Sequence, residues 1–192
     1  TDAGTTNFNG AIAITGALTQ TNAATGATTF GGAVAVGSAT LRGTTFDVQN
    51  SLTATGAIAV TNSGLFTKGA TGAITAPGGF STSGAASLAN SITTTNTLLS
   101  IGGALTLAEN ADVTLSTQGA AGAGAITVSG ATNGTAGGGN ETLTLNAGTG
   151  TVNLAAVSGA ANVADATGLT DVTVTDAGTT NFNGAIAITG AL

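Results

Sequence analysis

The sequence predicts an all-β protein, and within that class a right-handed parallel β-helix, also called a β-solenoid. Pairs of apolar residues separated by one residue recur along the whole chain, which is the spacing of side chains on one side of a strand. Gly, Asn, Asp or Ser flank almost every pair, so the strands are short and turns separate them. Apolar residues never recur at the helical spacing i, i+3, i+4, i+7 over a helix-sized window.

The expected strands, taken in chain order, each contain one such pair, and both of its members are expected to face a core. The pairs are Ile12/Ile14, Val34/Val36, Phe46/Val48, Ile58/Val60, Leu105/Leu107, Val113/Leu115, Ile126/Val128, Leu143/Leu145, Val152/Leu154 and Val172/Val174. Single apolar anchors lie between them, at Leu18, Leu41, Leu52, Phe66, Ile74, Phe80, Leu88, Ile92 and Leu169. The spacing is less regular after Gly72, and we expect residues 116–125 and 129–142 to form protruding loops or strained corners.

A solenoid is preferred to a β-sandwich because the turn signals of hairpins are rare. Asn-Gly and Asp-Gly dipeptides, which favour tight hairpins, occur only at Asn9, Asn133 and Asn183. Three similar phrases, at 10–15, 32–37 and 56–61, lie 22 and 24 residues apart, which is about one coil of three strands. Right-handed winding is expected because connections between parallel strands are overwhelmingly right-handed.

The chain carries a long internal duplication. Residues Thr175–Leu192 read TDAGTTNFNGAIAITGAL, which is identical to Thr1–Leu18 at an offset of 174 residues. Self-similarity at a fixed period is the signature of repeat architectures. We therefore expect residues 1–174 to form one full solenoid repeat and residues 175–192 to begin the next, identical repeat.

The junction between repeats is expected to be a continuous part of the column, because no Pro- or Ser-rich hinge separates Val174 from Asp176. The residues assigned to stacking across the junction are Phe182, Ile186 and Ile188, together with their counterparts Phe8, Ile12 and Ile14. The expected partners are other copies of the same repeat, both within one chain and through self-association into filaments or bundles.

Composition excludes several classes of function. Only Arg42 and Lys68 are basic, and the net charge is −6, so the chain cannot neutralise phosphates and nucleic-acid binding is not expected. No stretch of about 20 predominantly apolar residues is present, so no membrane-spanning helix is expected in this segment. The absence of Cys excludes disulfides and thiolate metal sites, and no cofactor is expected.

Neither catalysis nor metal binding is expected. General acid–base catalysis needs ionisable groups within mutual reach, and here there is no His and the acidic residues are scattered. Their positions are Asp2, Asp47, Glu109, Asp112, Glu141, Asp165, Asp171 and Asp176. Residues 137–145 partly match the calcium-binding nonapeptide of solenoids, but Thr142 stands where that motif has Asp, and no tandem copy follows. We interpret this segment as a Gly-rich loop entering a strand; the alternative calcium site is a surface one at Asp171 and Asp176.

Ice binding is a further alternative, because flat β-helical faces that carry Thr-x-Thr can match an ice lattice. The pattern occurs at Thr19/Thr21, Thr53/Thr55, Thr93/Thr95, Thr142/Thr144, Thr149/Thr151 and Thr173/Thr175. Its irregular spacing predicts that these pairs do not share one face in successive coils. Outward Thr is also a favourable strand residue without any ligand.

Two C-terminal runs resemble a known group of proteins. LTLNAGTGTVNLAAVSGA, from Leu143, and LTDVTVTDAGTTNFNGAIAITGAL, from Leu169, are similar to the repeats of filamentous-haemagglutinin-type and autotransporter-associated bacterial surface proteins. The earlier phrases TTFGGAVAVG and GAIAVTNSG have the same character. The resemblance implies a right-handed parallel β-helix, export to the cell surface or extracellular space, and a role in adhesion, biofilm or a surface filament.

The expected function is therefore a structural repeat unit of an extended bacterial surface or extracellular filament that supports adhesion or cell–cell cohesion. The alternative is an adhesin module that binds a glycan or receptor through protruding loops such as residues 129–142. A polysaccharide hydrolase or lyase is not expected, because the chain offers almost no ionisable side chains for catalysis.

Overall fold

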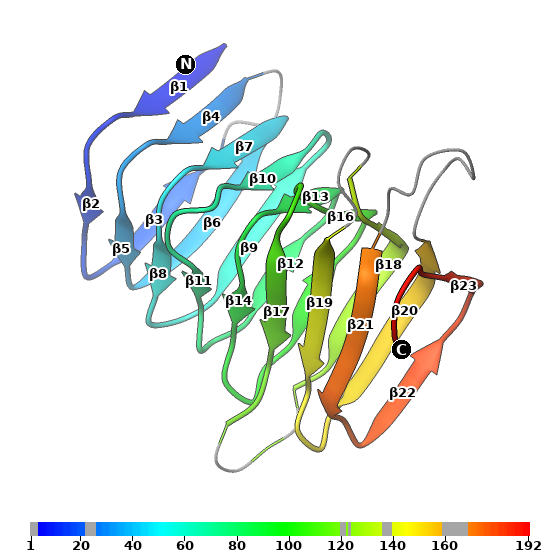
Figure 1. Ribbon diagram of the computed structural model, residues 1–192. Coiled ribbons are helices and arrows are strands. Elements are labelled where there is room, and N and C mark those ends of the chain that lie inside the picture. The colour runs from blue at the N-terminus through cyan, green and yellow to red at the C-terminus, as the bar shows by residue number, and fades with distance from the viewer. Residues whose placement is uncertain (1–3, 22–25, 120–121, 123, 136–139, 159–168) are drawn as a thin grey trace.

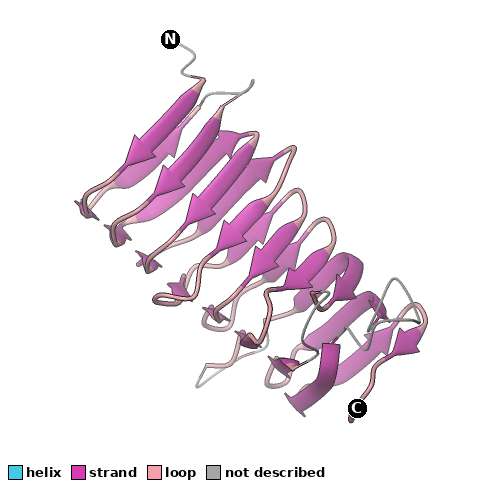
Figure 2. Cartoon of the chain, turned by 45° about the horizontal axis from the view of Figure 1, so that its top comes forward, coloured by secondary structure: helices cyan, strands magenta, loops and turns pink. Residues whose placement is uncertain are grey.

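The chain winds into a column of stacked coils, with the two ends of the chain at opposite ends of the column (Figures 1 and 2). The computed structural model describes residues 4–21, 26–119, 122, 124–135, 140–158 and 169–192. Within these ranges there is no helix, and the named strands pair in parallel throughout. The protein is therefore a parallel β-helix, as the sequence predicts. The right-handed sense of winding stays a prediction from the general rule for parallel connections.

Each coil contributes strands to three faces, which we call the first, second and third face in chain order. The first face contains β1 (Thr5–Phe8), β4 (Ala27–Phe30), β7 (Thr45–Val48), β10 (Phe66–Lys68), β13 (Ala86–Leu88), β16 (Leu105–Leu107) and β23 (Ile186–Ala187). The second face contains β2 (Ile12–Ala13), β5 (Val34–Val36), β8 (Leu52–Ala54), β11 (Ile74–Thr75), β14 (Ile92–Thr93), β17 (Asp112–Ser116), β19 (Glu141–Asn146) and β21 (Leu169–Asp176). The third face contains β3 (Ala17–Gln20), β6 (Ser38–Gly43), β9 (Ile58–Asn62), β12 (Phe80–Thr82), β15 (Leu99–Ile101) and β22 (Thr179–Phe182).

Two long strands, β18 (Ile126–Asn133) and β20 (Thr151–Ser158), turn the corner from the third face to the first. Ile126 of β18 pairs with Leu99 on the third face, and Thr132 of the same strand pairs with Leu105 on the first. β20 follows the same path over β18, and the pairing register shifts between Val128 and Ala131. The corner is therefore made by a bend within a strand rather than by a loop.

This bend corrects one expectation from the sequence. The sequence predicts a protruding loop or a strained corner over residues 129–142. The structure has no loop over 129–133, which belong to β18 and form the corner, or over 141–142, which begin β19. Small residues dominate the segment 129–132, so the strand can bend there without leaving the sheet, and Thr132 is fully buried. Residues 136–139 lie outside the described ranges. In the other expected loop, 116–125, Ser116 ends β17, Gly119 forms an isolated antiparallel bridge with Gly122, and 120, 121 and 123 also lie outside the description.

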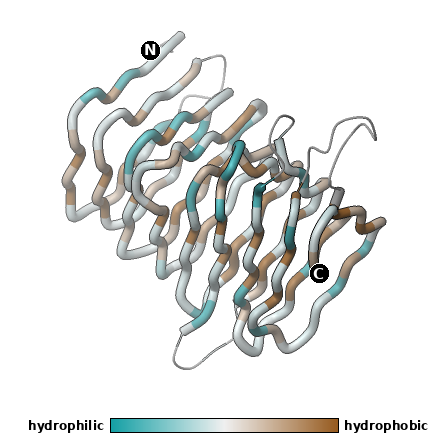
Figure 3. The backbone as a smooth tube through the Cα atoms, viewed as in Figure 1, coloured by the Kyte–Doolittle hydropathy of each residue, from teal (hydrophilic) through white to brown (hydrophobic). Residues whose placement is uncertain are grey.

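The core is a narrow column built from the inward residues of the three faces. Along the strands, apolar and polar residues alternate, which Figure 3 shows as alternating colours along the tube. In register, the buried stacks are Phe46–Phe66–Ala86–Leu105 on the first face, Val34–Leu52–Ile74–Ile92–Leu115–Leu145 on the second, and Ile58–Phe80–Leu99–Ile126–Val152 on the third. The sequence prediction of inward apolar pairs is confirmed for these strands.

The coil period inferred from the three similar phrases is only partly right. Ile12 and Val34, from the first two phrases, do pair on the second face. Ile58, from the third phrase, lies instead on the third face, and Leu52 is the residue that continues the stack above Val34. Corner segments differ in length from coil to coil, so two phrases with similar letters need not occupy the same face.

Candidate functional site

The two acidic residues considered for a surface calcium site, Asp171 and Asp176, both lie on β21. Asp171 and Asp176 lie at opposite ends of the part of β21 that follows Leu169, and each accepts a separate hydrogen bond, from the Ala191 amide at 2.6 Å and from Gln118 at 3.4 Å. Over the described ranges, no three Asp or Glu side chains come close enough together to hold a metal ion. Nor does any helix there have the length and apolar character needed to cross a membrane.

In the described part of the chain, two ionisable side chains, those of Lys68 and Glu141, are buried in the column, and the sequence does not predict the burial of either. The ammonium of Lys68 donates hydrogen bonds to the carbonyls of Gly69 at 2.7 Å and Thr71 at 2.8 Å, and reaches that of Val48 at 3.5 Å. Glu141 accepts a hydrogen bond from the Asn110 amide at 3.2 Å through Oε1. Among the described residues its other oxygen, Oε2, has no partner. The two residues contact turns of different coils, β10–β11 and β16–β17, so they do not form one site.

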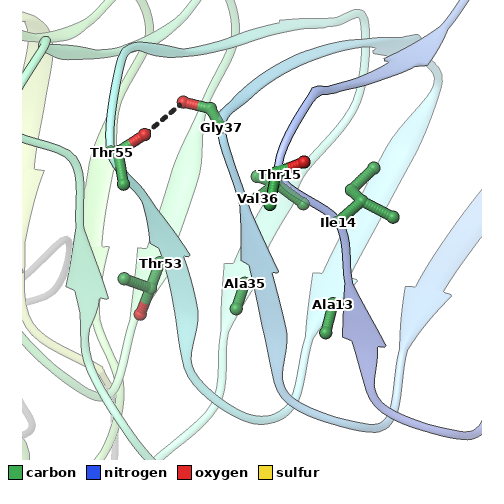
Figure 4. A pocket seen from close by; sticks show the side chains of 8 residues that line it. All are labelled: Ala13, Ile14, Thr15, Ala35, Val36, Gly37, Thr53 and Thr55. Atoms are coloured by element: carbon green, nitrogen blue, oxygen red, sulfur yellow. Dashed lines mark hydrogen bonds between the residues drawn. The ribbon is translucent and has the colours of Figure 1, made fainter.

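A shallow hollow opens on the second face near the start of the column (Figure 4). Its lining residues are Ala13, Ile14, Thr15, Ala35, Val36, Gly37, Thr53 and Thr55. The hydroxyl of Thr55 donates a hydrogen bond of 3.1 Å to the Gly37 carbonyl, so its proton is already engaged within the protein. Ligand sites usually combine apolar walls with a few convergent polar groups, and this lining has no charged or aromatic side chain. The hollow therefore offers little that would orient a glycan.

The threonines of the second face are more ordered than their spacing predicted. Thr53, Thr75 and Thr93 occupy one outward stack on successive coils, and Thr114, Thr144 and Thr173 occupy a second. The expectation that Thr-x-Thr pairs do not share one face in successive coils is therefore wrong for Thr142/Thr144 and Thr173/Thr175. The pairs Thr53/Thr55 and Thr93/Thr95 share this face too, but the coil that carries Thr75 lies between them. The first stack then continues into Ser116 and Asn146, so each run of Thr ends after three coils.

The two ends of the column are the remaining candidate site. At the N-terminal end, Phe8, Ile12 and Leu18 are half-buried and pack on the core, and Phe8 stacks on Phe30 with ring centroids 5.1 Å apart. Ile14 lies opposite Val36, because its amide donates to the Ala35 carbonyl. Val36 is 5% exposed, whereas Ile14 is 42% exposed. Ile14 therefore occupies a core position on the outermost coil, where no described coil covers it.

The duplicated segment forms the C-terminal end of the column. Phe182 pairs with Leu154, and Ile186 pairs with Val157. Phe182 and Ile188 pack partly against the core, while Ile186 is 36% exposed. The strand TTNF has the same alternation of exposed and half-buried residues at both ends, at Thr5–Phe8 and at Thr179–Phe182. All six residues that the sequence assigns to stacking thus lie on the outermost coils, and whether they contact another copy stays a prediction.

The glycines of the duplicated segment have different surroundings in its two copies. A Cβ added at Gly184 would overlap the carbonyl oxygen of Ala155 on the preceding coil, whereas one added at its counterpart Gly10 would meet nothing within 4 Å. The same contrast holds for the pairs Gly178/Gly4 and Gly190/Gly16. The sequence alone gave no reason to single out these glycines, because their role depends on a coil that lies far away in the sequence.

Comparisons of the chain with protein-family models, with curated proteins and with solved structures give no significant match.

Proposed function

We propose that the protein is a structural repeat unit of an extended bacterial surface or extracellular filament, and that it supports adhesion or cell–cell cohesion. Residues 1–174 make up one repeat in this proposal, and residues 175–192 begin the next. The observation that carries it is the continuity of the column: the duplicated segment adds β22 and β23 to β20 in parallel register, with no break after Val174.

The exposed apolar residues support this role. Ile14, Ile186 and Leu192 lie on the two outermost coils and are three of the five large apolar side chains that are exposed in the described part of the chain. Repeat proteins that stand alone need polar terminal caps, and open strand edges attract further strands. Apolar ends with unpaired edges instead suit a column that is continued by more coils.

A continuous column also suits a load-bearing or spacing role. Each coil contacts only its neighbours, so stability grows as a sum of intrinsic and nearest-neighbour terms when repeats are added. The outward surface is mostly Thr, Ser, Asn and Ala, which gives a polar rod of low charge density. Such a rod can project a distal domain or pack beside other rods, without chemistry of its own.

The test is small-angle X-ray scattering on proteins with one, two and three repeats. From β1 to β22, which are the same strand in the two copies of the duplicated segment, the chain advances by seven complete coils and two further faces. At a spacing of about 4.8 Å between strands, each added repeat should lengthen the particle by about 37 Å with an unchanged cross-section. The melting temperature should rise from one repeat to two. Particles that grow as flexible beads, with no gain in melting temperature, would contradict the proposal.

A further inference from the structure

The identical segment occupies different faces at the two ends of the column. In the first copy, TTNF forms β1 on the first face and the following Ile-Ala forms β2 on the second. In the second copy, TTNF forms β22 on the third face and Ile-Ala forms β23 on the first, because both strands pair with β20. The residues that follow β23 continue this pattern onto the second face, where the Val172 amide donates to the Ala191 carbonyl.

We propose that successive repeats stack with a rotation of one face, a third of a turn about the column axis, so that only every third copy has the same orientation. This inference rests on the proposed function, since it requires residues 175–192 to begin a further repeat. It follows from the coil count: a repeat that contains two faces beyond a whole number of coils cannot return its successor to the same face.

The rotation assigns a definite partner to each end of the repeat. In the first copy, Thr5–Phe8 is followed in the stack by Ala27–Phe30, with Phe8 beside Phe30. The same sequence at Thr179–Phe182 should therefore receive residues 27–30 of the next copy, on the third face. At the other end, Thr5–Phe8 should lie on β20 of the preceding copy, in the register in which Thr179–Phe182 lies on Thr151–Leu154.

The glycines provide a second observation for this junction. Gly10 and Gly4 have open space on the side where a Cβ would project, so nothing in the first coil requires glycine there. In the second copy, Gly184 and Gly178 approach the backbone of the preceding coil so closely that a Cβ would overlap the carbonyl oxygens of Ala155 and Thr149. Glycine is thus required at these positions only when a coil like the one that contains β20 precedes the segment.

Rotation changes how the filament presents its surface. The threonine stack at Thr53, Thr75 and Thr93 lies on one face of each repeat. In a rotated array this stack would point in three directions along the rod, instead of forming one continuous stripe. The partner that this fits is a second rod of the same protein, which could pack on any side, so that cohesion would build a three-dimensional bundle rather than a flat sheet.

The test uses a two-repeat protein, residues 1–174 followed by residues 1–192, with pairs of spin labels on introduced cysteines. The chain has no native Cys, so labelling is specific. With rotation, Leu18 of the second copy lies beside Val172, as Leu192 does in the hydrogen-bond register of the present chain. Spin labels at Thr173→Cys of the first copy and Thr19→Cys of the second copy should then show strong spin–spin broadening. Without rotation, Thr19 of the second copy would lie on the third face beside Asn153.

Each outcome is informative. Broadening in the Thr173 pair, with none in the pair Asn153→Cys and Thr19→Cys of the second copy, is the expected result. Broadening in the Asn153 pair alone would overturn the rotation and leave the continuous filament intact. If neither pair broadens and scattering shows flexible beads, both this inference and the proposed function fail.

A matched glycine pair tests the stacking without labels. In the two-repeat protein, Gly10→Ala in the second copy, which occupies the position of Gly184 in the present chain, should lower the melting temperature by about 2 °C or more, because the added methyl group would overlap the preceding coil. The same substitution in the first copy, Gly10→Ala at the free end, should leave the melting temperature unchanged. Equal effects of the two substitutions would mean that the junction coil does not stack as proposed.

Discussion

At the scale of single residues, Lys68 is the least expected feature of the core. It is 1% exposed and stands in an inward stack between Val48 and Leu88. Lysine is almost never fully buried unless it is paired, so sequence reasoning gave no ground to place it inside. The corner after β10 permits this burial, because the carbonyls of Gly69 and Thr71 accept hydrogen bonds from the ammonium of Lys68. Such a corner depends on backbone geometry that composition and spacing do not reveal.

Burial of Lys68 predicts a pH dependence of stability. Desolvation lowers the pKa of Lys68 from 10.5 to about 8, and the nearby charge of Asp47 opposes this shift. Between these two pKa values the unfolded chain binds more protons than the folded one, so the free energy of unfolding should rise with pH. Chemical denaturation between pH 7 and pH 11 should show this rise beginning near pH 8. The variant Lys68→Met should not show it, and a rise of the same size in that variant would assign the effect to other groups.

At the scale of elements, the alternation of side chains within each strand was predictable and the face that each strand occupies was not. Ile126 and Val128 face inward, as their spacing indicated, because the strand period acts over neighbouring residues only. The face of a strand depends on the length of every preceding corner. Ile12 and Ile58 belong to similar phrases yet lie on different faces, and the two identical copies of TTNF do the same. For the same reason, the rotated junction was out of reach of pattern reasoning.

Substitutions at two neighbouring positions of β18 test the inward and outward assignment. Ile126 is fully buried between Leu99 and Val152, so Ile126→Ala should cost about 2–5 kcal/mol in the free energy of unfolding. Thr127 faces outward and is partly exposed, so Thr127→Val should change that free energy by about 0.5 kcal/mol or less. Urea unfolding of both variants provides the measurement. Equal losses at the two positions would contradict the strand alternation.

At the scale of the whole molecule, the two ends of the 192-residue chain are not complementary to each other. Residues 1–18 at one end and 175–192 at the other have the same sequence. The surface on which this segment stacks is formed by β20 and β21, and in this chain the duplicated residues already cover it. A protein ending at residue 174 would leave that surface open and would carry its partner, the coil formed by β1, β2 and β3, at the opposite end. Contacts of this head-to-tail kind do not close, so they generate open filaments.

We therefore expect residues 1–174 to self-associate end to end at lower concentration than residues 1–192. Sedimentation velocity across a range of concentrations should show a ladder of rods for the shorter protein, while the longer one stays mainly monomeric. The matched control is Gly10→Ala in the shorter protein. Its methyl group meets nothing within the monomer, but it would overlap the Ala155 carbonyl of the neighbouring molecule, as it would at Gly184 in the longer chain. Association that persists in this variant would mean that the molecules meet through their sides, and that the ends of the column do not direct assembly.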